Sequence, residues 1–354
     1  MINSHLFAKR EFHSSLHGLR GIAILYVILS HFGNNQLFLL PMRHDAIGKV
    51  GVWIFFALSA FLLTNHLRRD LEIGESRICA ISQYTINRIF RIYPLYAIVL
   101  IGHVILHDIS GVDFLEHLLL LDGWGELWAI SVEFQYYAVI PVIAVCSLHM
   151  TKRGVALFLV AVLMVVVFYD WMRPASVFGD EIYLFPKLVP FLFGSILSLL
   201  QNTHILPKNL LISNVIKIAS ILGLIAATFW YREIAKNTLS IAFSPWLSIV
   251  ISGSTIGLIH AATKPNLLAS VLSARPLVFL GEISFSLYLL HMFVIRLISK
   301  ATEIPASARA WLALALCIVF AHISCQAIEG PSIRVGKILG ERLRRIAFLN
   351  RPGF

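Results

Sequence analysis

The sequence has few charged side chains. Asp, Glu, Lys and Arg make up 14% of its 354 residues, whereas apolar residues make up 58%. A soluble domain is about a quarter charged, so this chain has too little charge to cover a water-exposed surface. The mean hydropathy of +0.80 indicates that lipid is the solvent for much of the chain.

Cysteine is scarce as well. Cys79, Cys146, Cys317 and Cys325 form no CxxC pair and no disulfide framework, which is typical of small apolar core residues. The sequence also lacks Gly/Ser-rich linkers, low-complexity tracts, a clear internal repeat and any long polar segment. We therefore predict one membrane domain at residues 1–331 and a basic, partly amphipathic tail at residues 332–354 on the inner membrane surface.

Ten apolar runs are long enough to cross a bilayer as helices. They lie at residues 18–38, 47–66, 92–108, 126–148, 154–170, 185–201, 212–231, 243–262, 277–298 and 308–328. The predicted fold class is therefore all-α, a polytopic integral membrane protein of about ten transmembrane helices. Residues 113–121 are apolar but too short to span, and we expect them to lie in the interface or to re-enter.

The basic residues fix the orientation. If the chain begins on the inner side and alternates, about 20 of the 29 Lys and Arg residues fall inside, as the positive-inside rule requires. Both termini are therefore predicted to be cytoplasmic. The formal net charge of +10 fits loops that meet anionic headgroups. No basic stripe with interleaved aromatic residues lies outside the spans, so no nucleic-acid partner is predicted.

Three ionisable residues lie deep within predicted spans: His31, Glu133 and His291. A rise of about 1.5 Å per residue places all three roughly 16–20 Å above the inner boundary. Ionisable side chains at this depth are costly in lipid, so they face the bundle interior and commonly serve function. His31 alone is also compatible with a packing histidine, whereas a carboxyl such as Glu133 needs a partner or a proton.

A second polar level lies at the cytoplasmic ends of the spans. Arg20 enters the first span, and Arg88 and Arg91 precede the third on one helix face. Guanidinium groups suit bidentate recognition of phosphate, although Arg88 and Arg91 are equally compatible with interface anchors. His103 and His107 have the spacing of metal ligands, but they lack a third ligand and no metal site is predicted.

Six segments of the chain, in order, match a known family. They are residues 17–32, 51–62, 88–94, 127–137, 280–291 and 328–334. Ten residues separate Arg20 from His31, residues 88–94 hold a pair of arginines, and Glu133 follows a Trp-x-x-Ser-Val sequence. The chain resembles the acyltransferase 3 family of bacterial membrane acyltransferases. It departs from the family's usual residues at His17, Ala60, Ala129 and Phe134.

The resemblance implies an acyl-CoA-dependent enzyme that transfers an acyl group, usually acetyl, from the cytoplasm to a hydroxyl of a cell-surface glycan such as O-antigen or exopolysaccharide. The expected location is the bacterial inner membrane, with acyl-CoA as co-substrate and no permanently bound cofactor. Arg20, Arg88 and Arg91 are the expected acyl-CoA ligands.

The resemblance and the chemistry of the side chains also suggest roles at the upper level. His31 is expected to act as base or nucleophile, Glu133 to orient it, and Ser131 to donate to the oxyanion. His291, with Tyr288, is expected to bind the acceptor or relay a proton.

A polytopic transporter or flippase is the rival class, because intramembrane charges also mark transport pathways. Transporters often have inverted repeats and broken helices; no repeat is evident here, although Pro186 and Pro190 are able to break a helix. A binding-only sensor is a third class. The sequence does not name the acceptor sugar, the acyl group or the oligomeric state.

Overall fold

The computed structural model describes residues 2–37, 39, 46–73, 76–201, 209–301 and 303–349. In this part of the chain the secondary structure is helical, without strands, which confirms the all-α class. The α-helices are α1 (Ile2–Asn34), α2 (Gly48–Glu72), α3 (Arg77–Ile105), α4 (Gly111–Leu118), α5 (Trp128–His149), α6 (Lys152–Met172), α7 (Pro174–Val177), α8 (Leu188–Leu200), α9 (Leu210–Ala235), α10 (Ser244–Ala262), α11 (Leu267–Leu272), α12 (Arg275–Glu282), α13 (Ser284–Ser299), α14 (Ala306–Ser324) and α15 (Gly330–Leu349). Short 3₁₀ turns η1 (Gly125–Leu127), η2 (Phe185–Lys187) and η3 (Ile241–Phe243), and a π-turn η4 (Cys325–Glu329), connect or extend them.

The helices follow the ten predicted apolar runs. By length and composition, eight helices of the described part are able to cross a membrane, and the bent pair α12–α13 would make a ninth. The remaining run coincides with a shorter apolar helix, Phe185–Leu200. The chain is therefore a multi-pass membrane protein, while the count of ten spans stays a prediction. The short run at 113–121 forms α4, which does not span.

Helix α2 lies at the centre of the bundle. It packs against α1, α5, α8 and α10, and most of its residues are buried, among them Trp53, Phe56 and Phe61. Helix α9 is peripheral and exposes apolar side chains such as Ile225 and Phe229. Because a soluble protein rarely exposes such large apolar surfaces, this face is expected to contact lipid.

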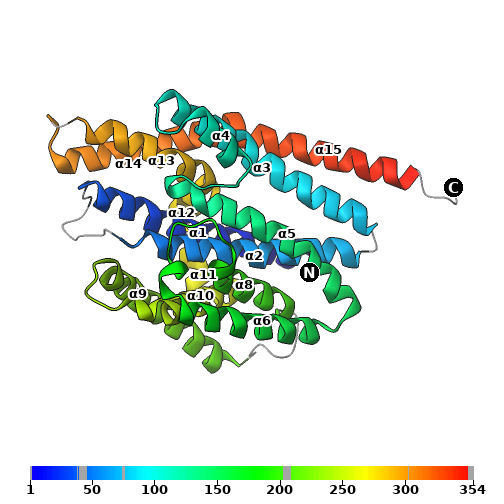
Figure 1. The fold of residues 1–354 in the computed structure, drawn as a ribbon. Coiled ribbons are helices and arrows are strands. Elements are labelled where there is room, and N and C mark those ends of the chain that lie inside the picture. Colours follow the sequence, from blue (N-terminus) through cyan, green and yellow to red (C-terminus); the bar gives the residue numbers. More distant parts are fainter. Residues whose placement is uncertain are drawn as a thin grey trace.

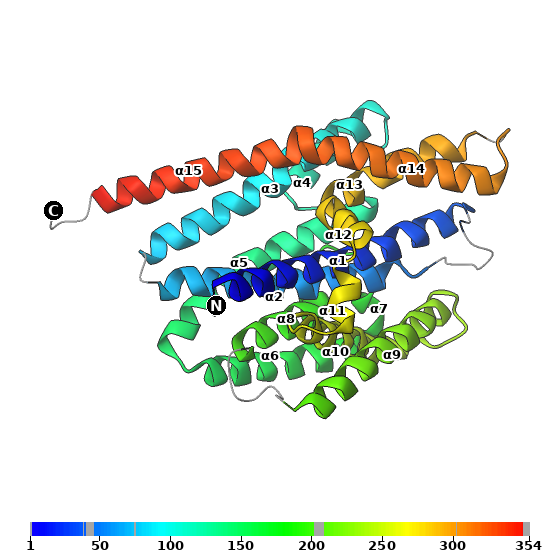
Figure 2. The same ribbon diagram turned by 180° about the vertical axis from the view of Figure 1, so that it is seen from behind.

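The start of α1 and the end of α15 point toward the same end of the bundle (Figures 1 and 2). This arrangement agrees with both termini being on one side, and the identity of that side stays a prediction. Helix α15 continues α14 through the π-turn and packs along α3. The helix crosses residue 331 without a break, so the predicted division into a membrane domain and a tail remains a prediction, and residues 350–354 of that tail lie outside the described residues.

Glycines bring the backbones of α1 and α12 together. A Cβ atom built on Gly281 would lie 1.8 Å from the carbonyl oxygen of His17, and one on Gly21 would lie 2.2 Å from the carbonyl oxygen of Leu277. Small residues at such crossings let membrane helices approach closely. The crossing fixes the height of α12 against α1, and therefore the position of the chain that follows α12.

Helices α12 and α13 meet at a bend of 76°. The bend lies at Ile283, so α13 begins at Ser284 inside the bundle. Ser284 accepts a hydrogen bond from the Nη2 of Arg20 on α1, at 3.1 Å. A broken helix of this kind exposes backbone polar groups, which are tolerated at membrane depth only where protein or a water-filled cavity surrounds them.

Candidate active site

A cavity of about 490 Å³, here called the outer cavity, lies where α1 ends and α2 begins. Its wall includes His31 from α1, Lys49 from α2, Glu126 from η1, and Tyr288 and Arg296 from α13. Trp124, Trp128 and Tyr231 add aromatic faces. Its volume is within the usual range for a small-molecule site, as is its mixture of aromatic surface and a few polar groups.

His31 and His291 meet beside the outer cavity. Their ring centroids are 4.9 Å apart, with the ring planes inclined by 59°. His31 lines the cavity, while His291 is fully buried behind it. The structure thus brings together two of the three residues that the sequence places at one depth.

The tautomer of His291 follows from its surroundings. Its Nδ1 lies 2.6 Å from the carbonyl oxygen of Tyr288. Since a carbonyl oxygen only accepts hydrogen bonds, Nδ1 carries the proton and Nε2 of the neutral ring presents a lone pair. This Nε2 is buried without a hydrogen-bond partner in the described part of the protein. The ring is therefore able to accept a proton at Nε2.

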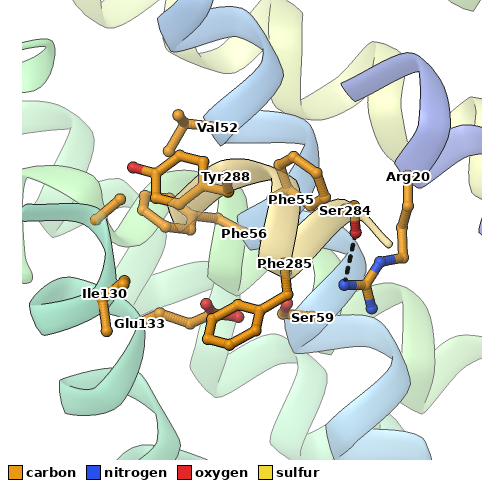
Figure 3. A pocket seen from close by; sticks show the side chains of 11 residues that line it. Arg20, Val52, Phe55, Phe56, Ser59, Ile130, Glu133, Ser284, Phe285 and Tyr288 are labelled. Atoms are coloured by element: carbon orange, nitrogen blue, oxygen red, sulfur yellow. Dashed lines mark hydrogen bonds between the residues drawn. The ribbon is translucent and has the colours of Figure 1, made fainter. Parts of the chain in front are cut away.

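A second, narrower cavity, here called the inner cavity, lies deeper in the bundle and has a volume of about 60 Å³. Arg20 enters it from α1, and Glu133 reaches from α5 toward Ser59 and Phe285 (Figure 3). Val52 and Tyr288 line both cavities. The two spaces therefore adjoin, with Tyr288 between the histidine pair and the arginine.

Charged groups surround the inner cavity. Arg20 interacts electrostatically with Glu133 and Arg91, and Arg88 also interacts with Glu133. The Nη2 of Arg91 lies 3.5 Å from Glu329, a buried carboxylate that also accepts a hydrogen bond of 3.0 Å from Ser286. Glu329 is the last residue of the π-turn, and such turns often occur at functional sites. The predicted arginine level is thus one cluster, held by carboxylates.

Two predicted residues do not line the outer cavity with His31. Ser131 is fully buried, and its hydroxyl donates a hydrogen bond of 3.3 Å to the carbonyl oxygen of Asp122. Glu133 lines the inner cavity rather than the outer cavity that His31 lines. The structure therefore places neither the oxyanion donor nor the orienting carboxylate in the outer cavity, whereas Tyr288 borders both cavities.

Several wall residues of the outer cavity are missing from the sequence prediction. Lys49 forms an ion pair with Asp180, which also lines the cavity. The Nζ of Lys49 lies 3.9 Å from the ring centre of Trp128. Glu126 is 7% exposed, and the sequence prediction gives it no role. A charged residue next to the Leu127–Trp128 motif was the available signal.

An electrostatic network flanks this wall. Arg296 forms an ion pair with Asp108, and Asp108 also lies 2.8 Å from the Nδ1 of His103. Partial burial raises the pKa of the Asp108 carboxyl, but the hydrogen bond to His103 and the charge of Arg296 outweigh it and lower that pKa. Asp108 is therefore ionised at neutral pH and engages Arg296. His103 is buried and His107 exposed, and no metal-binding group of His, Cys, Asp and Glu occurs among the described residues.

The model of the acyltransferase 3 domain, described as an acyltransferase domain, matches residues 13–328. The chain belongs to the acyltransferase 3 family. It is 26% identical to the peptidoglycan O-acetyltransferase OatA of Listeria monocytogenes, over 93% of this chain and 57% of that protein. It is 25% identical to a Bacillus subtilis protein, YrhL, whose name assigns it to the same activity, over 92% of this chain and 56% of the relative.

A Staphylococcus aureus protein whose name assigns it O-acetyltransferase activity, SAS0844, is 25% identical over 93% of this chain and 59% of its own length. The chain thus spans less than two thirds of the length of these relatives. No solved structure matches the chain.

Proposed function

We propose that this chain is a membrane O-acyltransferase. It takes an acyl group, acetyl, from acyl-CoA on the cytoplasmic side and transfers it to a hydroxyl of a cell-surface glycan on the outer side of a bacterial cytoplasmic membrane. The family match and the O-acetyltransferase names of its relatives support this reaction. The observation that carries it is the pair of adjoining cavities, with Arg20 at the inner one and His31 at the outer one.

The inner cavity suits the acyl end of the donor. A space of about 60 Å³ holds a small acyl group and not a nucleotide, so the nucleotide of acyl-CoA remains outside it. Arg88 and Arg91 then meet the phosphates, because guanidinium groups bind phosphate with two parallel hydrogen bonds. Arg20, at the cavity itself, lies near the thioester. Glu329 pairs with Arg91, and the charge of Glu133 attracts Arg20 and Arg88.

His31 carries the chemistry in this proposal. As a general base, it removes the proton of the acceptor hydroxyl while that oxygen attacks the thioester carbonyl. As a nucleophile, it first takes the acyl group on a ring nitrogen and then passes it to the hydroxyl. In both routes the carbon–sulfur bond breaks, a carbon–oxygen bond forms, and the hydroxyl proton ends on the sulfur of CoA.

His291 supports His31 in either route. Its Nε2 lone pair is fixed by the hydrogen bond from Nδ1 to the Tyr288 carbonyl oxygen. The Nε2 of His291 can therefore receive a proton from His31, once a small movement of the His31 ring brings the two ring nitrogens within hydrogen-bond distance. This arrangement supports the relay role for His291, while Tyr288 lies between the donor space and the acceptor space.

The test of the function compares two strains, one with the gene and one without it. Ester-linked acetate released by mild alkali from surface polysaccharide should be higher in the strain that carries the gene, and labelled acetyl-CoA should supply it in membranes. Transport without transfer would consume no acetyl-CoA and form no acetyl ester. That outcome would return the chain to the rival class of transporters and flippases.

The arginine assignment gives a separate prediction. Replacing Arg88 and Arg91 together by alanine should weaken binding of acetyl-CoA to the protein in detergent by at least about 100-fold, since each charge-assisted hydrogen bond contributes about 1.5–3 kcal/mol. Isothermal titration measures the affinity. Arg153, an exposed arginine at the start of α6, is the matched control, and its alanine variant should bind normally. Unchanged affinity in the double variant would make Arg88 and Arg91 interface anchors.

A further inference from the structure

The wall of the outer cavity contains a buried carboxyl group that the proposed mechanism does not use. Glu126 is 7% exposed and lines the cavity together with His31. Its Oε1 is buried and has no hydrogen-bond partner in the described part of the chain. A buried carboxyl oxygen without a partner is destabilising, and residues that carry such a cost are common at functional sites.

The neighbouring charges do not neutralise Glu126. The charge of Arg296 acts on it, but Arg296 is paired with Asp108. Lys49, the other cation of the wall, is paired with Asp180. The polar groups around Glu126 thus have partners of their own, which leaves its carboxyl available to a group that enters the cavity.

Hydrogen bonds to backbone carbonyl oxygens connect Glu126 to the histidine pair through Tyr288. Gly125, in the left-handed region at φ +53°, turns the chain into η1. The carbonyl oxygen of Glu126 then accepts a hydrogen bond from the hydroxyl of Tyr288, and the carbonyl oxygen of Tyr288 accepts one from His291. Two hydrogen bonds therefore connect the position of Glu126 to that of His291, which lies against His31. A ligand bound to Glu126 would therefore be held at a fixed position relative to His31.

We propose that Glu126 binds the acceptor glycan, by accepting a hydrogen bond from a sugar hydroxyl and turning the reacting hydroxyl toward His31. The inference rests on the proposed function, because it assigns the outer cavity to the acceptor. Neutral sugar hydroxyls are good donors to a carboxylate. Trp124, which lines the same wall and is partly exposed, supplies apolar aromatic surface for a sugar ring.

Glu126→Gln tests the inference, because it preserves the size of the side chain and removes its charge. Three quantities are measured on the full chain: alkali-released acetate on surface polysaccharide at equal protein level, the affinity for acetyl-CoA in detergent, and the melting temperature. We expect surface acetate to fall by about 10- to 100-fold, and the affinity for acetyl-CoA to stay within about twofold. The melting temperature should stay level or rise, because a buried ionisable carboxyl with one unpartnered oxygen becomes a neutral amide.

Two further variants complete the comparison. Glu116 is an exposed glutamate on α4, and Glu116→Gln should leave all three quantities unchanged. Glu126→Asp keeps the charge on a shorter side chain and should recover part of the lost acetylation. Wild-type surface acetate in Glu126→Gln overturns the inference. So does a parallel loss of acetyl-CoA affinity or a lower melting temperature, since each assigns Glu126 a structural role.

Failure of the proposed function is recognised separately. In that case the wild-type chain itself adds no acetyl ester, and the comparison of the strains with and without the gene shows it before any Glu126 variant is made. A wild-type chain that acetylates normally, beside a Glu126→Gln variant that does the same, overturns the acceptor site alone.

Discussion

Replacing His31 by alanine is expected to reduce acylation of the surface glycan by at least about 10²–10⁴-fold, the usual contribution of a general acid or base. The residue lies at the wall of the outer cavity, so its removal enlarges a space that is already open and should leave the fold intact. The measurement is ester-linked acetate on surface polysaccharide, at matched protein level, in a strain without the native gene.

The control for this variant is another histidine outside both cavities. His149 is exposed at the end of α5 and contacts Arg77, so His149→Ala should acetylate normally. Acetyl-CoA affinity should be unchanged in His31→Ala, because the arginine cluster is untouched. Normal surface acetate in His31→Ala would remove His31 from the reaction and with it the role proposed for His291.

The same residue decides between the two routes. When the protein is mixed with radiolabelled acetyl-CoA without an acceptor and quenched, a nucleophilic His31 should leave label on the wild-type chain and none on His31→Ala. A general base leaves neither chain labelled, although acetate transfer to the glycan in cells still requires His31.

The second large effect is expected at the crossing of α1 and α12. Gly281→Ala would place a Cβ atom 1.8 Å from the carbonyl oxygen of His17, and backbone at that distance cannot give way as a flexible side chain does. The helices must separate, at a cost at or above the usual range of about 1–3 kcal/mol for overpacking. We expect a clear fall in melting temperature and in the yield of monodisperse protein from size-exclusion chromatography.

In Gly281→Ala, acylation should fall by more than the loss of folded protein explains. Ser284 follows Gly281 by three residues and accepts a hydrogen bond from Arg20. Separation of the helices therefore distorts the inner cavity, although Gly281 itself does not line it. Gly253 on α10 is the control, because a ring carbon of Phe193 lies at an ordinary contact distance of 3.8 Å from a Cβ atom built there. Gly253→Ala should be neutral or slightly stabilising. An equally mild Gly281→Ala would contradict the close crossing.

The sequence predicts the helical class and the segments well, because a run of apolar residues is a strong signal for a membrane helix. It misses the length of α3, which begins at Arg77 rather than near residue 92. Polar residues such as Gln83 and Arg88 interrupt the apolar run there, and hydropathy alone ends the segment. The bend at Ile283 is also invisible, since Ser284 and Glu282 are compatible with a continuous helix.

The candidate site was only partly predictable. Counting helix rise brings His31 and His291 to one depth, and the structure places their rings together. The same count puts Glu133 beside them, although it lines the inner cavity. Depth gives a position along the membrane normal and not the direction of a side chain around its helix, which depends on packing. For the same reason the count did not identify Glu126 as a wall residue.

Tyr288 and Val52, which line both cavities, have a consequence for the cell's energy supply. If two water-filled spaces approached each other from opposite faces of a membrane and joined, protons would leak through them and dissipate the proton gradient. In the proposed reaction only an acetyl group passes these two side chains, while the nucleotide stays on one face and the glycan on the other. The acetyl group then crosses the membrane without an open pathway for ions, and no pore has to open and close in each cycle.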